Sequence, residues 1–230
     1  MLLSGAQLYG LLGFHFAQGY HVISPDQGGH GESGEYVSSE NEYRALKLWL
    51  VQNGCTKIEF LYGASMGAAT AYKLCSDPDI EVKAAWLDGA CLVSKAPFTE
   101  WLLKRIFRHC KRRADKRRID ALPILDKMYG RGLARAMTDS LRRIGTHSLD
   151  AICHCCCHYD LQPLSPKMQR RLHLDFGGKE FNLRFSRKAI RSYMPGVDVT
   201  IRRGRCHCEY MARQTEGYVK DIKGFLERCA

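Results

Sequence analysis

The chain has 230 residues, of which 45% are hydrophobic and 26% are charged. This length and composition supply one sizeable core and exclude an intrinsically disordered protein. No segment approaches the roughly 20 apolar residues that a membrane-spanning helix needs. The apolar start of the chain also lacks the basic residues that open a secretory signal, so we expect a folded protein with no membrane segment and no signal peptide.

The formal net charge of +11 is unevenly distributed. Residues 1–90 carry 5 basic and 10 acidic side chains, residues 91–170 carry 17 and 7, and residues 171–230 carry 13 and 7. The change of sign near residue 90 indicates a boundary between chemically different parts. The predicted parts are a first core segment at 1–94, a helical cap at 95–166 and a second core segment at 167–230.

Strand-like and helix-like segments alternate before and after this basic region, as follows in chain order. The predicted elements are a strand at Leu2–Leu3, a helix at about 9–18, a strand at His21–Ser24, a helix from Ser39 to about Asn53, a strand at Lys57–Tyr62, a helix at Ala68–Cys75, a strand at Val82–Leu87, only helices from Pro97 to about Leu164, a strand at Leu172–Phe176, a helix at Ser186–Tyr193, a strand at Val197–Ile201 and a helix at Tyr210–Arg228. This alternation predicts an α/β fold with a mostly parallel sheet of about six strands. The cap is expected as an insertion after the strand that ends near Asp88.

The pattern Gly-x-Ser-x-Gly lies between a predicted strand and a predicted helix, at Gly63–Gly67. In such a turn the serine occupies a strained conformation and projects its hydroxyl above the strand ends, so its neighbours two positions away must be small. The following helix directs its positive end at a developing oxyanion. We predict that Ser65 is a nucleophile.

A serine nucleophile needs a histidine base and an acid that orients it, and after this kind of turn the order along the chain is Ser, acid, His. His207 follows the last predicted strand and precedes the last helix, so it is the expected base. Glu180 lies in the loop after the preceding strand and is the expected acid. Asp88, at the end of an earlier strand, is the alternative acid.

The oxyanion hole needs two backbone N–H donors. We expect one from Met66, the residue after the nucleophile. The other is expected from the loop after the first predicted strand, at Ala6 or Gln7.

Four motifs in order resemble the α/β-hydrolase superfamily over nearly the whole chain. Asp26–Ser33 is similar to its D-x-x-G-H-G-x-S turn, Gly63–Gly67 to its nucleophile elbow, Gly177–Glu180 to its G-x-x-D acid loop with Glu in place of Asp, and Gly204–His207 to its G-x-x-H segment. The resemblance implies that the first of these turns is structural and that the cap forms a lid over the active site. The usual His-Gly of the oxyanion loop is replaced here by Ser4-Gly5.

The cap carries clustered basic residues from Lys104 to Arg118, interleaved with apolar ones. These charges could form a positive rim that attracts anionic substrates, bind nucleic acid phosphates, or be a solvated helix face. We expect a small ester or acyl substrate, with nucleic acid the less expected partner.

The 11 cysteines are an odd number, and four of them stand in the run Cys153–His158. Neighbouring cysteines cannot all form disulfides without strain, so mostly free thiols and a cytoplasmic protein are expected. Adjacent ligands converge poorly on one tetrahedral ion, so we expect no metal site and no cofactor.

The predicted function is that of a serine hydrolase. It would cleave a small carboxylic ester, or a related acyl compound, through a Ser65–His207–Glu180 triad and an acyl-enzyme intermediate, with thioester or C–C bond hydrolysis as variants. The alternative is a non-catalytic binding protein on the same fold, whose basic cap binds acidic ligands or nucleic acid.

Overall fold

The computed structural model describes residues 2–93, 95–116, 122–159 and 161–229. None of the described helices is long and apolar enough to cross a membrane.

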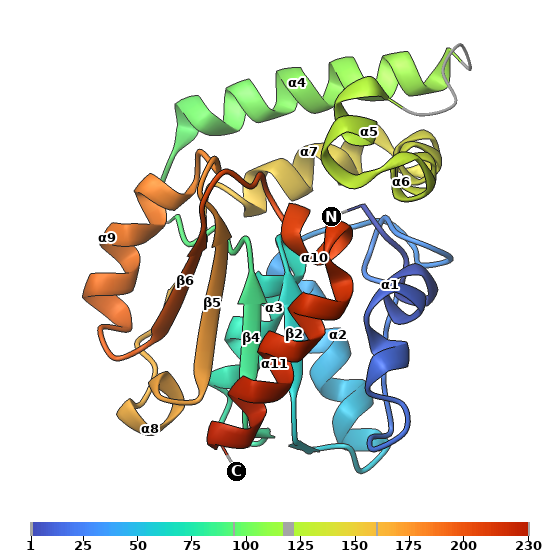
Figure 1. The fold of residues 1–230 in the computed structure, drawn as a ribbon. Coiled ribbons are helices and arrows are strands. Elements are labelled where there is room, and N and C mark those ends of the chain that lie inside the picture. Colours follow the sequence, from blue (N-terminus) through green and yellow to red (C-terminus); the bar gives the residue numbers. More distant parts are fainter. Residues whose placement is uncertain (1, 94, 117–121, 160, 230) are drawn as a thin grey trace.

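Four parallel strands form the central sheet in the order β2-β4-β5-β6 (Figure 1). These strands are β2 (Leu61–Ala64), β4 (Ala85–Asp88), β5 (Leu172–Gly177) and β6 (Asp198–Arg202). Because all four run in the same direction, their carboxyl ends meet at one edge of the sheet. In open α/β sheets this edge is where ligands bind.

Two short strands, β1 (Lys57–Ile58) and β3 (Glu81–Val82), pair with each other and precede β2 and β4. Lys57 lies opposite Glu81, and Leu61 lies opposite Ala85, so both pairs keep an offset of 24 residues (81 − 57 and 85 − 61). The predicted strands at 57–62 and 82–87 are therefore each present, with a bend that preserves the register.

The two strands predicted before residue 25 are wrong, because the structure has no strand at Leu2–Leu3 or at His21–Ser24. In this region, side chains rather than a neighbouring strand form hydrogen bonds with the backbone. The Ser24 hydroxyl donates to the Gly5 carbonyl at 2.8 Å, and the Gly5 N–H donates to an Asp26 carboxylate oxygen at 2.6 Å. Within the described residues, the central sheet consequently has four strands rather than about six.

Helices cover both faces of the sheet (Figure 1). One face packs against α2 (Ser39–Gln52), α3 (Met66–Cys75), α8 (Pro166–Gln169) and α9 (Leu183–Tyr193). The other packs against α1 (Gly5–Leu11), α10 (Glu209–Arg213) and α11 (Thr215–Cys229), with Leu12 and Phe16 on either side of the 3-10 turn Gly13–His15. Along β4, Ala85 and Leu87 face the first group while Trp86 faces the second. This alternation is the two-residue period of a strand buried on both sides.

The first and the last predicted helices differ from those observed. Ser4 and Gln7 form a capping box, so the first helix begins at Gly5 rather than near residue 9. Helix α2 begins at Ser39 as predicted, and Ser38 caps it by accepting from the Asn41 N–H. The predicted closing helix is two helices, α10 and α11.

A helical insertion separates β4 from β5 and lies above the carboxyl ends of the strands (Figure 1). Its helices are α4 (Pro97–Asp115), α5 (Pro123–Tyr129), α6 (Arg131–Arg143) and α7 (Thr146–Cys155). It has a small core of its own, which the N-terminal Leu2 joins: Ala114, Leu122, Leu141, Ile144 and Leu149.

Candidate active site

Ser65 sits in the turn between β2 and α3 with φ 54° and ψ −116°. A positive φ strains a non-glycine residue sterically, and such strain collects at functional sites. The Ser65 N–H donates to the Asp88 carbonyl at 2.8 Å, which fixes the turn to the end of the neighbouring strand. This is the geometry expected of a nucleophile elbow.

The two glycines that flank the turn are not equally required. A Cβ on Gly63 would stand 2.8 Å from both Ala71 Cβ and the Gly67 carbonyl oxygen. A Cβ on Gly67 would meet nothing nearer than a Gln27 side-chain atom at 3.4 Å. The turn therefore excludes a side chain at residue 63 and leaves room for a methyl group at residue 67.

The two expected oxyanion donors begin helices. Met66 opens α3 and Ala6 is the second residue of α1. In the described part of the chain, neither the Met66 N–H nor the Ala6 N–H has a hydrogen-bond partner. The Gln7 N–H is already bonded to the Ser4 hydroxyl at 3.2 Å, so Ala6 is the better candidate for the second donor.

Asp26 anchors the loop that carries Ala6. One of its carboxylate oxygens accepts from the Gly5 N–H at 2.6 Å and the other from the Glu32 N–H at 2.9 Å. A Cβ on Gly31, whose φ is +55°, would collide with this carboxylate at 2.1 Å. The Gly-rich turn thus holds the start of α1 in place through Asp26.

His207 and Glu180 are 27 residues apart and meet at the carboxyl edge of the sheet. His207 Nδ1 lies 2.8 Å from Glu180 Oε2. The other Glu180 oxygen accepts from the Gly177 N–H at 2.6 Å, and its side chain is only 1% exposed, against 28% for His207. The carboxylate is thus fixed at one end by the backbone and can hold the imidazole ring in one orientation.

The loop after β5, which carries Glu180, and the loop after β6, which carries His207, are joined by backbone hydrogen bonds. The Gly178 N–H donates to the Arg202 carbonyl at 2.8 Å, and the Lys179 N–H donates to the Arg205 carbonyl at 2.9 Å. A Cβ on Gly177 would stand 2.3 Å from the Cys206 carbonyl oxygen, so only glycine permits this approach.

Burial opposes protonation of His207, but the Cys208 sulfur and the Glu180 carboxylate outweigh it and hold the pKa of His207 well above its ordinary value. Burial raises the pKa of the Cys208 thiol to about 11, so this group is uncharged at neutral pH. We therefore attribute the raised pKa of His207 near neutrality chiefly to Glu180.

Asp88, the alternative acid, is bonded elsewhere. Its carboxyl accepts from the Tyr218 hydroxyl at 2.9 Å, and no hydrogen bond joins it to His207 in the part of the chain described. Burial, followed by repulsion from Asp175, raises the pKa of Asp88 to about 7. The geometry favours Glu180 over Asp88 as the partner of the imidazole.

The His207 ring packs on the Cα of Gly89, where a Cβ would meet it at 2.4 Å. Among the described residues, no hydrogen bond joins the Ser65 hydroxyl to His207. The cavity beside Ser65 has a volume of about 10 Å³, which holds about one water molecule. In enzymes without substrate, catalytic hydrogen bonds are often long or poorly aligned and tighten only when substrate binds.

Comparison with known proteins identifies the scaffold. The profile of the α/β hydrolase fold family matches residues 4–153. This chain belongs to the α/β hydrolase fold family.

Solved structures agree with this assignment of the fold. An α/β hydrolase from a Medee basin deep-sea metagenome library has a TM-score of 0.75 at 12% identity, with 98% of this chain and 86% of that chain covered. A bromoperoxidase from Bacillus anthracis has a TM-score of 0.72 at 17% identity, covering 98% and 88%. A thermophilic esterase from Thermogutta terrifontis has a TM-score of 0.68 at 15% identity, covering 96% and 85%. No curated protein matches the sequence significantly.

Several residues of this α/β hydrolase reach the candidate site without a sequence signal. Cys208, beside the expected base, is left-handed with φ 51°, and only it and Ser65 are non-glycine residues with positive φ in the described chain. Cys91 and Cys156 line the cavity with Ser65. A hydrogen bond from Cys156 lowers the pKa of the Cys91 thiol below its ordinary value. Only long-range contacts reveal these neighbours.

Proposed function

We propose that this α/β hydrolase is a serine hydrolase that cleaves small carboxylic esters or related acyl compounds. The observation that carries the proposal is the strained backbone of Ser65 at the strand–helix turn. The His207–Glu180 pair lies at the same edge of the sheet and supplies a base with an orienting acid. One of the structurally similar proteins is called an esterase, which agrees with this assignment.

In the proposed reaction the Ser65 hydroxyl attacks the ester carbonyl carbon while His207 takes its proton. The Met66 and Ala6 N–H groups stabilise the oxyanion, and Glu180 stabilises the imidazolium. The C–O bond of the ester then breaks, the alcohol leaves with the proton from His207, and an acyl–Ser65 ester remains. Water, deprotonated by His207, hydrolyses this ester and restores the enzyme.

The small cavity beside Ser65 requires the helical insertion to move before an ester can enter. Cys155, Cys156 and Tyr159, at the carboxyl end of the insertion, close the cavity over Ser65. We infer that the insertion acts as a cap that opens for substrate and closes to exclude water.

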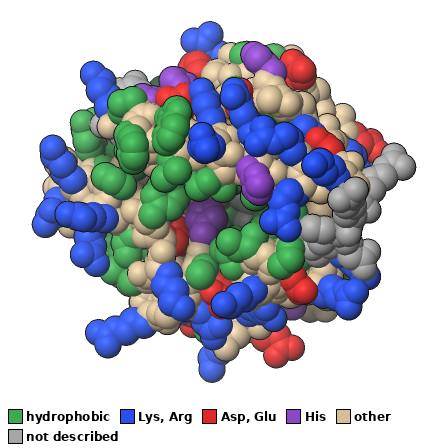
Figure 2. All heavy atoms as spheres, turned by 90° about the horizontal axis from the view of Figure 1, so that it is seen from above, with side chains coloured by type: hydrophobic (Ala, Val, Ile, Leu, Met, Phe, Trp, Pro, Cys, Tyr) green, Lys and Arg blue, Asp and Glu red, His purple; other side chains and the backbone are tan. Residues whose placement is uncertain are grey.

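The charge of the cap bears on the choice of substrate. Seen from above, Lys and Arg side chains surround a hydrophobic patch and a central hollow (Figure 2). Helix α4, at the top of the molecule in Figure 1, carries exposed Arg105, Arg112 and Arg113, along with exposed Trp101. Such a positive surface concentrates anionic esters near the entrance, in a manner that salt screens.

The decisive experiment is labelling with a small fluorophosphonate, which reacts with activated serines. Wild-type protein and Ser76→Ala, changed at an exposed serine just after α3, are expected to be labelled, whereas Ser65→Ala is expected to be inert. An unlabelled wild type, or labelling that survives Ser65→Ala, would exclude the proposed nucleophile. Comparing KM for a neutral aryl ester and a carboxylate-bearing analogue at low and high salt then tests the anionic preference.

A further inference from the structure

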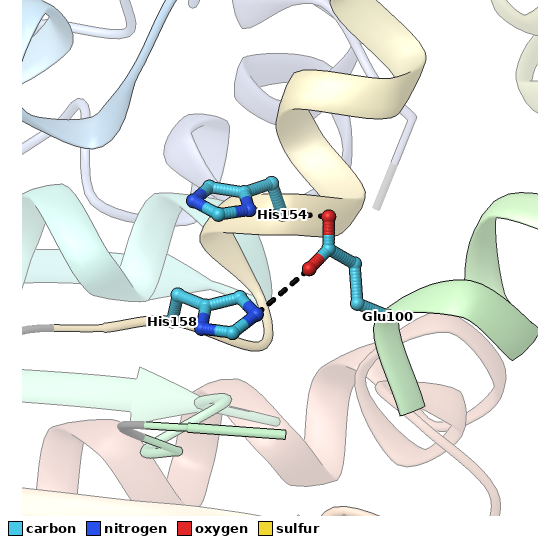
Figure 3. A group of neighbouring side chains, drawn as sticks. All are labelled: Glu100, His154 and His158. Atoms are coloured by element: carbon cyan, nitrogen blue, oxygen red, sulfur yellow. Dashed lines mark hydrogen bonds and ion pairs between the residues drawn. The ribbon is translucent and has the colours of Figure 1, made fainter. Parts of the chain in front are cut away.

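Glu100, His154 and His158 form a polar cluster in the helical insertion, and none of them belongs to the proposed Ser65–His207–Glu180 triad. Glu100 lies in the first turn of α4, His154 is near the end of α7, and His158 follows three residues after that helix. Figure 3 shows both imidazole rings directed at the Glu100 carboxylate. His154 Nδ1 lies 3.1 Å from Glu100 Oε1, and His158 Nε2 lies 2.7 Å from Glu100 Oε2.

The three side chains are already close to the spacing of metal ligands. One nitrogen of each histidine and a Glu100 oxygen all lie within 4.8 Å of one another. Around a tetrahedral ion with bonds of about 2.0–2.1 Å, neighbouring ligand atoms stand about 3.3 Å apart. The imidazole rings are stacked with centroids 4.5 Å apart and planes at 18°, so one ring must turn about its soft χ2 torsion to converge with the other.

We propose that Glu100, His154 and His158 bind one divalent transition-metal ion of the zinc class. Two imidazoles and one carboxylate suit such ions, whereas Ca²⁺ and Mg²⁺ prefer ligand shells made of oxygen. The side chain of His154 is 60% exposed, so water can reach the site and complete a four-coordinate shell. The cysteines that stand between the two histidines are not part of this ligand set.

Lys104 is the group that competes with the ion. Its ammonium is bonded to the Glu100 carboxylate, from one turn farther along α4. The Lys104 side chain is 30% exposed and flexible, so it can swing into solvent at little cost when the ion takes its place. Binding thus replaces one positive partner of Glu100 with another.

The position of the site gives it a structural consequence. The Ala96 N–H, next to the start of α4, donates at 3.0 Å to the carbonyl of Cys157, the residue before His158. The intervening Cys155 and Cys156 line the cavity at Ser65. An ion held by both α4 and the end of α7 therefore joins the first and last helices of the insertion and stabilises it in the closed position.

Titration of the full-length reduced protein with Co²⁺ tests the site, because this ion reports its ligands by its absorption spectrum. We expect one Co²⁺ per chain with the weak visible bands of nitrogen and oxygen ligands. Losing a supporting residue near a metal site costs about 10–100-fold in affinity, so His154→Gln and His158→Gln, which each remove a ligand, should weaken binding at least about tenfold. His147→Gln, an exposed histidine of the same helix, is the matched control and should bind as wild type does.

Three outcomes would overturn the proposal. One is the absence of Co²⁺ binding to folded wild-type protein. Another is binding that His154→Gln and His158→Gln leave unchanged. The third is a strong thiolate-to-cobalt charge-transfer band that disappears after alkylation of the cysteines, because it would place the ion on sulfur. Circular dichroism of each variant checks that the fold is intact. We expect it to be intact in His154→Gln, because the His154 side chain is exposed.

Discussion

Replacing Glu180 with glutamine removes one charge from the candidate site and nearly preserves the shape of the side chain. In the wild type, one carboxylate oxygen accepts from the Gly177 N–H at 2.6 Å and the other faces His207 Nδ1 at 2.8 Å. A glutamine keeps its oxygen on Gly177 and presents its NH₂ group to Nδ1. His207 must then carry its proton on Nε2, the nitrogen that should accept the proton of Ser65.

The opposite amide orientation also has a cost. It presents the glutamine NH₂ to the Gly177 N–H and leaves a buried donor unsatisfied, at about 1–3 kcal/mol. The wrong tautomer is therefore favoured, and in a serine triad that change slows turnover about 10⁴-fold. For Glu180→Gln we expect turnover to fall by a factor between about 10³ and 10⁴, which raises the activation barrier by about 4–5.5 kcal/mol.

The assay is hydrolysis of a short-chain aryl ester as a function of pH. Because the carboxylate raises the pKa of His207, wild-type activity should fall as pH drops through that raised value. In Glu180→Gln the acid limb of the profile should move to lower pH, because the supporting charge is gone. A loss below about tenfold, or an equal loss in Asp88→Asn, would show that Glu180 is not the orienting acid.

Three further changes test the scaffold around the site. Gly63→Ala should destabilise the fold by about 1–3 kcal/mol because its methyl group overlaps the neighbouring helix. Gly67→Ala should change the free energy of unfolding little, and urea unfolding of the two variants measures the difference. Asp26→Ala leaves two backbone N–H groups without their acceptor and should lower the free energy of unfolding by about 1–2 kcal/mol in the same experiment. It should also lower kcat, because the loop before α1 is held less firmly. An unchanged kcat would argue against an oxyanion donor from that loop. Asp88 binds its proton more tightly in the folded state, where its pKa is about 7, than in the unfolded state, where it is about 3.9, so its contribution to stability declines as pH rises from about 4 to about 7. Asp88→Asn should remove this decline, so the variant should gain stability relative to wild type between pH 5 and pH 8. If the difference in unfolding free energy between variant and wild type is the same at pH 5 and at pH 8, the raised pKa of Asp88 is contradicted.

Local sterics made part of this site predictable. Residue 63, in the turn before Ser65, and residue 177 are positions where only glycine fits, so the sequence pattern there carries structural information. The order Ser, acid, His then picked out Glu180 and His207, which the structure brings into contact; their catalytic roles stay predictions.

What the sequence did not reveal depends on contacts between distant segments. The segment before residue 25 has strand-like composition, yet Ser24 and Asp26 replace ladder bonds with side-chain bonds. The left-handed backbone of Cys208 also depends on tertiary packing, as does the approach of Glu100 to His154 of α7 and to His158 just after that helix. A one-dimensional pattern does not record such packing.

The chain leaves the core for the insertion and returns to it at adjacent points. The Tyr159 N–H donates to the Val93 carbonyl at 2.8 Å, so the segment that leads into the insertion and the segment that leads out of it are hydrogen-bonded to each other. A segment whose two ends adjoin can be lengthened, shortened or exchanged as a cassette, since the strands on either side need not be rethreaded. Variation confined to this cassette could change which molecules reach Ser65 while the sheet and its loops stay the same.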